Sequence, residues 1–292
     1  MNDLTTLFCH VDDFWKTFEQ QWNSHLLDNQ KKKRGPASEL SISEMMTIVI
    51  FFHQSNYRTF KHFYSFILEF YKPYFPALIS YDRFVHRMKS LFIPLFAFLL
   101  AHKGLITGIA FIDSTSIAVC HNKRITRNKV FQGLAKRGKT TSGWFYGFKL
   151  HLIINDRGEI LAFQLTQGHV SDVSQAEVLA KGITGKLFGD KGYIASDLTK
   201  KLFEQGLQLI TAIRKNMKQK MMQLEDKLLL RKRSLIETVN DQLKNISQIE
   251  HSRHRSPHNF LINLLAGLSA YCLQDKKPSL NLSSCEYALI AA

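Results

Sequence analysis

Two aspartates and one glutamate occupy positions suited to metal-dependent chemistry. Asp113 follows the apolar run 109–112, and Asp190 follows the short run 186–189; both runs are typical of buried strands. A carboxylate at a strand end, beside the edge of a sheet, can be held rigidly enough to bind a hard cation. Considered alone, each aspartate is more simply explained as a turn or helix-capping residue.

The third acid, Glu237, lies in a segment from about 219 to 248 whose apolar spacing predicts one long helix. At about 100° per residue, Arg233 and Lys244 lie roughly 40° and 20° from Glu237 around the axis, so the three share one face. An apolar stripe lies roughly opposite: Leu228, Leu235, Val239, Leu243 and Ile246. An Arg and Glu pair on a solvated face is the simpler alternative.

The three acids together suggest a site for phosphoryl transfer. Two Mg²⁺ ions about 4 Å apart can activate an attacking oxygen and stabilise the leaving one. Without cations, three clustered carboxylates would repel each other and a phosphate. We therefore predict that Asp113, Asp190 and Glu237 are the catalytic residues and the metal ligands. Two Mg²⁺ are the expected ions, with Mn²⁺ as the alternative.

The charge of the chain predicts an anionic partner. Its 292 residues include 39 Lys and Arg against 24 Asp and Glu, a net charge of +15, and the pI is about 9.6. Such a surface favours phosphate backbones. Seven cations and no acid lie between His121 and Thr140: Lys123, Arg124, Arg127, Lys129, Lys136, Arg137 and Lys139. We expect these seven, with Arg233 and Lys244, to contact DNA; a solvated basic loop is the alternative.

The pattern along the chain predicts the elements that position these residues. Residues 5–102 have helical spacing, and Ser41 to Glu44 has the form of a capping box. Strand-like segments follow, including a hairpin of 145–154 and 159–167, then strands alternate with helices, and a last helix opens at Pro257. This order predicts an α/β (α+β) fold, in which a mixed sheet with flanking helices is preceded by a helical domain.

The predicted domains are a helical N-terminal domain (1–103), a catalytic domain (104–273) and a C-terminal tail (274–292). With 45% hydrophobic and 22% charged residues, the composition excludes a disordered or fibrous protein. The four cysteines are far apart and favour neither a disulfide framework nor a zinc ribbon. No secretory signal is visible, and the longest apolar run, 91–101, is short for a bilayer. We expect a cytoplasmic protein without membrane contact.

Three motifs give the chain a resemblance to a known family. They are Phe111-Ile-Asp113-Ser-Thr115, Gly189-Asp190-Lys-Gly-Tyr193, and the spacing R-x3-E-x6-K from Arg233 through Glu237 to Lys244. Together they resemble the DDE transposases of bacterial insertion sequences. The segment from Ile249 to Pro257 is similar to the tail of the insertion-sequence group numbered 982. The resemblance covers about residues 104–273 and, more loosely, the N-terminal part.

This resemblance implies a ribonuclease-H-like core, with the first Asp on the first strand, the second Asp after the fourth strand and the Glu on a following helix. The 47 residues between Asp190 and Glu237 leave no room for a large inserted domain. The implied function is to cut the ends of an insertion sequence and join them to target DNA, with the N-terminal domain helping to recognise the ends. The implied partners are double-stranded DNA at the ends and the target, and further copies of the chain, at least a dimer.

Two other functions remain open at this point. One is a ribonuclease-H-like nuclease that only hydrolyses and does not join strands. The other is a non-catalytic DNA-binding protein derived from a transposase. The intact Asp, Asp and Glu favour catalysis over the second alternative.

Overall fold

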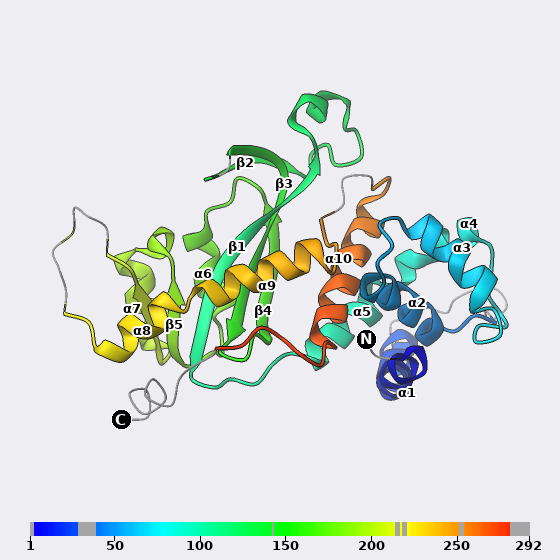
Figure 1. Ribbon diagram of the computed structural model, residues 1–292, viewed down its shortest axis with the longest axis horizontal. Helices are drawn as coiled ribbons and strands as arrows, with labels where there is room; N and C mark the ends of the chain where they lie inside the picture. Colours follow the sequence, from blue (N-terminus) through cyan, green and yellow to red (C-terminus); the bar gives the residue numbers. More distant parts are fainter. Residues whose placement is uncertain are drawn as a thin grey trace. The chain divides into compact units, whose positions relative to one another are not determined.

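The computed structural model describes residues 3–28, 39–141, 143–213, 217, 221–250 and 254–280. These residues divide into two compact units, drawn in Figure 1. The first lies within 1–102, 245–249 and 254–274, and the second within 103–244, 250–253 and 275–292. The predicted tail, 274–292, is described as far as Leu280, whose N–H donates to the carbonyl oxygen of Asp156 (2.9 Å).

In the first unit, every regular element that the structure describes is a helix. The elements are α1 (Leu4–Asp28), α2 (Ile42–Gln54), α3 (Phe60–Phe70), α4 (Tyr81–Arg87), the 3-10 helix η1 (Met88–Leu91), α5 (Phe92–Ala101) and α10 (Pro257–Cys272). α10 packs against α2 and α5. The sequence-based domains placed residues 257–273 with the catalytic part, whereas the structure places α10 here. Because α10 is apolar around most of its circumference, it must be buried on several sides.

The start of α2 confirms the predicted capping box. The Oγ of Ser41 accepts from the N–H of Glu44 (3.1 Å), and Oε2 of Glu44 accepts from the N–H of Ser41 (2.7 Å). These two bonds satisfy backbone donors that the helix itself leaves unpaired. α10 begins at Pro257 as expected, but the side chain of Ser256 makes no capping hydrogen bond.

One helical stretch, Tyr81–Ala101, is long and apolar enough to cross a bilayer when judged by length and composition alone. It comprises α4, η1 and α5, and it is longer than the apolar run 91–101 visible in the sequence. Phe84, Leu91 and Leu95 are fully buried in the first unit, as core side chains are. A core helix meets the same criteria as a membrane span, so the absence of membrane contact stays a prediction.

The second unit is built on a mixed sheet. Its strands are β1 (Ile109–Cys120), β2 (Lys136–Thr140), β3 (Gly143–Asn155), β4 (Ile160–Gln167), β5 (Gly185–Gly189) and β6 (Leu207–Thr211). β1 pairs antiparallel with β3, which pairs antiparallel with β4 and, through its first residues, with β2. β5 lies parallel to β1, and β6 lies parallel to β5. The sheet order is therefore β4-β3-β1-β5-β6, with β2 beside the beginning of β3.

Helices and short turns complete the second unit. They are η2 (Asn122–Arg127), α6 (Asp172–Leu179), η3 (Lys191–Tyr193), α7 (Ser196–Glu204), α8 (Leu224–Arg231) and α9 (Ser234–Asn245). α6 and α7 share a core with the sheet, in which Leu179 and Leu202 pack with Ile112 and Leu187. α9 crosses the strands, as Figure 1 shows. The result is a mixed α/β unit with helices against a sheet, as the sequence predicts.

The predicted hairpin is confirmed in β3 and β4. At its turn, Oδ1 of Asn155 accepts from the N–H of Arg157 (3.0 Å) and of Glu159 (2.9 Å). Gly158 has a φ of +71°, a conformation that glycine adopts at little cost. The Asn, Asp and Gly residues of this segment therefore form the hairpin turn that the sequence predicts.

The prediction of one long helix over 219–248 is wrong. The structure has two helices, α8 and α9, separated at Lys232 and Arg233, while residues 219 and 220 lie outside the described part. After the break, the N–H of Leu235 donates to the carbonyl of Lys232 (3.0 Å), a three-residue spacing that tightens the turn. Leu235 is buried, but Ile246 is 54% exposed, so the predicted apolar stripe does not extend past α9.

An ion pair to the sheet fixes α8 separately from α9. The ammonium group of Lys186, on β5, donates to Oδ1 of Asp226 (2.8 Å) and to the carboxylate of Glu225. Both acids lie in the first turn of α8, where negative charge also suits the helix dipole. The periodic spacing of apolar residues cannot predict this contact with a distant strand. The contact accounts for the separate placement of α8.

Candidate active site

The register of two parallel strands brings Asp113 and Asp190 together. On β1 and β5, Phe111 is paired with Phe188, a difference of 188 − 111 = 77 residues. Asp113 and Asp190 differ by 190 − 113 = 77, so they stand at corresponding positions two residues beyond the last pair, and the charge of Asp190 acts on Asp113. Because side chains alternate along a strand, Asp113 leaves the sheet on the same side as Phe111.

The two strands hold these aspartates differently. Asp113 lies inside β1, which continues to Cys120, so the prediction that Asp113 ends a strand is wrong; the pairing of β1 with β5 ends two residues earlier, at Phe111. Asp190 directly follows β5 and caps η3, with Oδ1 accepting from the N–H of Gly192 (2.6 Å). Asp113 is therefore partly buried and Asp190 exposed.

α9 supplies the third acid and a link to the first. Glu237 lies in the first turn of α9, and its Oε1 accepts from Nη2 of Arg233 (2.6 Å). One turn further along, Nδ2 of the buried Asn240 donates to Oδ2 of Asp113 (3.1 Å). This hydrogen bond fastens α9 to β1 beside the two aspartates, which places the helix of Glu237 at the same site.

The electrostatics of Asp113 reflect this crowding. The pKa of the Asp113 carboxyl is raised to about 6, chiefly by burial, and the charges of Asp190 and Glu237 contribute to this rise. A hydrogen bond from the backbone of Ser114 and the charge of Arg233 act in the opposite direction. The pKa of Asp113 thus records three carboxylates near enough to repel each other, with one guanidinium among them.

Asp113, Asp190 and Glu237, the predicted metal ligands, do not form a closed cluster in the structure. Among the described residues, no three His, Cys, Asp or Glu side chains lie close enough together to hold one ion. Each acid instead has a partner within the chain: Asn240 for Asp113, Gly192 for Asp190 and Arg233 for Glu237. The chemistry of the donors nevertheless suits a hard cation, because carboxylate and amide oxygens are the ligands that Mg²⁺ prefers.

Two buried oxygens near the aspartates lack hydrogen-bond partners. Oδ1 of Asn240 and the hydroxyl of Tyr193 are both buried, and the structure gives neither a partner. Burial raises the pKa of the Tyr193 hydroxyl, and the charges of Asp113, Asp172 and Asp190 raise it further. Unsatisfied oxygens beside a carboxylate with a raised pKa fit a site that gains from a bound cation.

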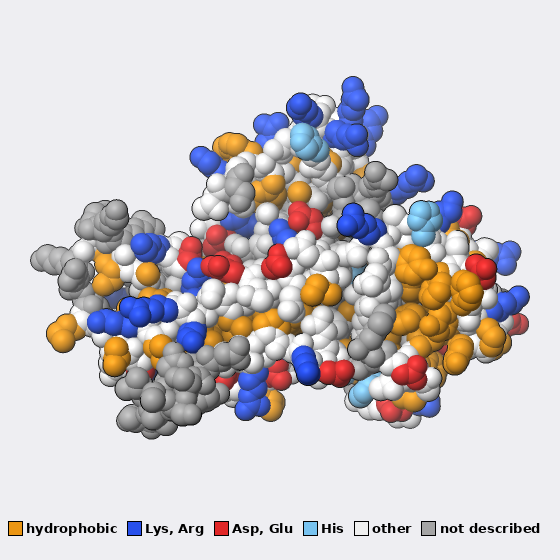
Figure 2. Space-filling view, in the orientation of Figure 1, with side chains coloured by type: hydrophobic (Ala, Val, Ile, Leu, Met, Phe, Trp, Pro, Cys, Tyr) orange, Lys and Arg blue, Asp and Glu red, His pale blue; other side chains and the backbone are white. Residues whose placement is uncertain are grey.

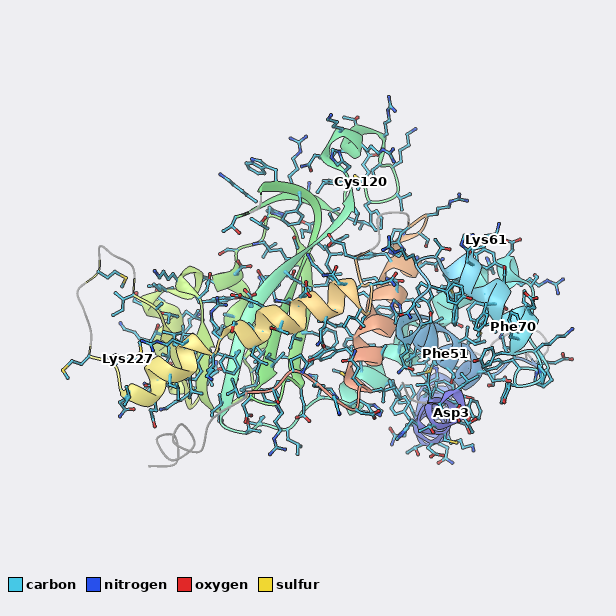
Figure 3. All side chains as sticks on the ribbon, viewed as in Figure 1. Asp3, Phe51, Lys61, Phe70, Cys120 and Lys227 are labelled. Carbon is cyan, nitrogen blue, oxygen red and sulfur yellow. The ribbon has the colours of Figure 1, made fainter. Side chains whose placement is uncertain are left out.

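The seven predicted DNA-binding cations are all exposed and lie on one projecting part of the second unit. Lys123, Arg124 and Arg127 lie on η2, Lys129 follows it, and Lys136, Arg137 and Lys139 lie on β2. Figure 2 shows Lys and Arg side chains gathered there, and Figure 3 marks Cys120 where β1 leads into this part. The segment is therefore structured.

The additional strand β2 changes the numbering that the resemblance implied. Asp190 follows the fifth strand along the chain, not the fourth, because residues 136–140 pair with β3.

Arg233 and Lys244 both have acidic partners: Arg233 binds Glu237, and the ammonium group of Lys244 lies 3.2 Å from Oε2 of Glu250. Arg233 lies at the break between α8 and α9, whereas Glu237 and Lys244 lie on α9. The expectation that all three residues share one continuous helix is therefore wrong for Arg233.

Sequence reasoning missed three residues of this site. Asn240 is three positions after Glu237, so helical geometry alone would have placed the two on neighbouring parts of one face. Tyr193 stands in the motif that contains Asp190, but its buried hydroxyl could not be foreseen from spacing. Asp172, at the start of α6, reaches the site only through the packing of α6 on the sheet.

The comparisons with known proteins agree with this arrangement. The transposase DDE domain family matches residues 103–257, which is more than half of the chain. The chain therefore belongs to the transposase DDE domain family. The match covers Asp113, Asp190 and Glu237 together with the whole sheet. The comparison with curated proteins gave no match, and neither did the comparison with solved structures.

Proposed function

We propose that this protein cuts DNA at the ends of an insertion sequence of the group numbered 982 and joins those ends to target DNA. The observation that carries the proposal is that Asp113 and Asp190 follow the paired segments of the parallel strands β1 and β5, with α9 fastened to Asp113 through Asn240. The chain belongs to the transposase DDE domain family, and the matched residues include all three acids, which supports assigning them the phosphoryl-transfer role. The match to the tail motif includes residues 251–253, which lie outside the described part.

The sheet order supports a ribonuclease-H-like core. Three antiparallel strands, β1, β3 and β4, are followed along the chain by two strands parallel to β1, with helices between them. This mixed sheet has β1 at its centre and the acids beside it. We propose that the helical first unit helps to recognise the element ends, and that the protein acts in the cytoplasm as a dimer or larger assembly on double-stranded DNA.

Asp113, Asp190 and Glu237 would hold two Mg²⁺ ions, with Mn²⁺ as the alternative, and Asn240 would position Asp113 through its amide nitrogen. Bound divalent ions would supply positive charge for the phosphate and for the oxygens exchanged at phosphorus. The protein's own part is to hold the carboxylates rigidly on β1, after β5 and on α9. The raised pKa of Asp113 means that its charge is costly until a cation balances it.

The basic residues have a separate part in this proposal. Lys123, Arg124, Arg127 and their neighbours on η2 and β2 would bind the phosphate backbone and position the DNA. Arg233 would exchange its bond to Glu237 for a phosphate, and Lys244 would do the same with Glu250. Guanidinium and ammonium groups near the reacting phosphate stabilise its developing charge.

A strand-transfer assay tests the proposal. Purified protein is incubated with Mg²⁺ and DNA that carries the coding region with its natural flanking sequence, together with a target plasmid. We expect cleavage at both flanks and covalent joining to the plasmid, because hydrolysis and strand transfer use the same in-line displacement. Cleavage without joining would identify a nuclease, and binding without cleavage would identify a non-catalytic DNA-binding protein.

A further inference from the structure

A cavity of about 360 Å³ lies in the second unit beside the candidate active site. Its lining comes from β2, β3, the segment 168–172 and the turn after Asp190. The side chains and backbone that matter here belong to Arg137, Lys139, Trp144, Lys149, His169 and Gly192. A volume of this size lies within the usual range of about 300 to 1,000 Å³ for small-ligand sites.

The cavity touches the candidate active site through Gly192. The N–H of Gly192 donates to Oδ1 of Asp190 (2.6 Å), so the turn that lines the cavity also holds the second aspartate. A Cβ atom added at Gly192 would lie 2.7 Å from that same oxygen. A molecule bound in the cavity is therefore next to Asp190.

The charge of the lining favours an anion. Arg137 and Lys139 are exposed, and Lys149 donates to Oδ1 of Asp172 (3.1 Å) and to the carbonyl of Val170 (3.1 Å). Asp172, the one acid among the lining residues that the structure describes, is thus paired with Lys149. Three cations and one carboxylate leave a net charge of +2 when His169 is neutral, which suits a phosphate.

Trp144 adds an aromatic surface to this charge. Its side chain is 62% exposed, although it lies on a strand whose next residues, Phe145 and Tyr146, are buried. The ammonium group of Lys139 lies 5.7 Å from the ring centroid, in cation–π range. An exposed aromatic ring beside cations is the combination that binds unpaired nucleotides, because bases stack on the ring while cations hold the backbone.

Two glycines fix the wall of the cavity. A Cβ atom on Gly138 would lie 2.1 Å from the carbonyl oxygen of Gly168, and one on Gly168 would lie 2.8 Å from that of Lys136. β2 and the end of β4 therefore approach backbone to backbone at a distance that only glycine allows. The position of Arg137 and Lys139 relative to Trp144 is set by this rigid contact.

We propose that this cavity binds one unpaired nucleotide of a DNA strand, with its base on Trp144 and its phosphate at Arg137 and Lys139. When the base stacks on Trp144, the ammonium group of Lys139 leaves the ring and binds the phosphate of the nucleotide. The inference rests on the proposed function, and it extends it: the enzyme prefers a DNA end with an unpaired nucleotide next to the position of cleavage. Among the described residues of the lining, no buried polar pair reads base identity, so the stacking is tolerant of sequence.

Binding without cleavage tests this inference. Affinities for a blunt duplex and for the same duplex with a two-nucleotide thymine overhang are measured by fluorescence anisotropy, with Mg²⁺ replaced by EDTA. The wild type is expected to bind the overhang duplex more tightly by about 5- to 150-fold, the usual worth of a stacked base. Trp144→Ala should reduce this preference to near one, and Trp144→Phe should retain much of it because a ring remains.

The matched control is Phe203→Ala. Phe203 is on α7 in the same unit and is 71% exposed, but it does not line the cavity, so the preference should persist. Equal affinity of the wild type for both duplexes would overturn the inference, as would a Trp144→Ala protein that keeps the preference. A Trp144→Phe protein that loses it fully would also overturn it. Because the assay contains no divalent ion, its outcome is independent of whether the protein cleaves or joins DNA.

Discussion

At the scale of single residues, Asp113 carries an electrostatic cost in the free protein. Its pKa is raised to about 6 from an ordinary value of 3.8, chiefly by burial. Between these two pH values the folded protein keeps a proton that the unfolded chain has lost. The free energy of unfolding therefore falls as the pH rises through this range, and the penalty is complete above pH 6.

Asp113→Asn should therefore stabilise the free protein at pH 7.5. The gain is up to about 3 kcal/mol, since one pKa unit corresponds to 1.36 kcal/mol, and partial exposure of the site reduces it. At pH 4.5 the gain should be much smaller, because the wild-type carboxyl is then protonated. Thermal melts of both proteins at the two pH values measure the difference. A variant that is less stable than the wild type at pH 7.5 would contradict this account of Asp113.

Divalent ions should stabilise the same site. We expect Mg²⁺ to raise the melting temperature of the wild type at pH 7.5, because an ion bound only to the folded state shifts the equilibrium toward it. Asp190→Asn removes one carboxylate from the site and should weaken this response. The control is Asp197→Asn, which changes an exposed aspartate on α7. Equal shifts in all three proteins would mean that the ion binds elsewhere.

At the scale of elements, α10 depends on close contact with its surroundings in the first unit. A Cβ atom on Gly267 would lie 2.5 Å from Cγ2 of the buried Ile249 and 3.3 Å from Nδ1 of His53. His53 is itself fixed, because its ring nitrogen Nδ1 bonds the carbonyl of Ser247 (2.5 Å), and burial lowers its pKa to about 4.

Gly267→Ala should therefore destabilise the protein by about 1–3 kcal/mol, the usual cost of overpacking, despite the better helix propensity of alanine. Ile249→Ala removes the Cγ2 atom, so the double variant should lose less stability than the sum of the two single variants. Urea unfolding of the four proteins completes this cycle. Full additivity, or stabilisation by Gly267→Ala, would show that the contact is not as tight as it is described.

Elements with a strong local signal were predictable from the sequence. The capping box at Ser41 and the Asn155 turn each depend on neighbours within four residues, and both formed as expected. The break between α8 and α9 was not predictable, because Lys186 anchors α8 from a distant strand. β2 was also missed, since its sequence, Lys136-Arg-Gly-Lys-Thr140, has no apolar alternation and relies on pairing with β3.

In the candidate site, too, the features set by local sequence were predictable and those set by tertiary contacts were not. The sequence identified Asp113 and Asp190 by their position after apolar runs, and the parallel register then brought them together. Asn240 and Asp172 escaped notice because their relation to Asp113 and Tyr193 arises from helix packing on the sheet. A sequence pattern can show which carboxylates are poised for chemistry, whereas the neutral groups that position them depend on tertiary contacts.

At the scale of the whole molecule, the net charge of +15 should make DNA binding depend on salt. Changing Lys123, Arg124 and Arg127 to Gln removes three exposed cations of η2. We expect the slope of log affinity against log salt to fall by up to about 2.7, since each phosphate contact contributes about 0.9. Affinities for a blunt duplex at several salt concentrations give the slope.

A matched triple variant controls for the loss of charge alone. Lys181, Lys200 and Arg231 are exposed cations of the second unit outside the segment 121–140, and changing them to Gln should alter the slope less. An unchanged slope in the η2 variant would mean that these cations are only a solvated basic surface.

The proposed function requires Asp113, Asp190 and Glu237 for DNA strand cleavage. The most direct measurement compares the wild type with Asp113→Asn, Asp190→Asn and Glu237→Gln, using DNA that carries the natural flanks, with Mg²⁺ for cleavage and gel shift for binding. Each variant removes one carboxylate charge and leaves the basic surface intact. We predict that each abolishes cleavage and retains binding to DNA. A pure, folded Asp190→Asn protein that cuts at the wild-type rate would contradict the account.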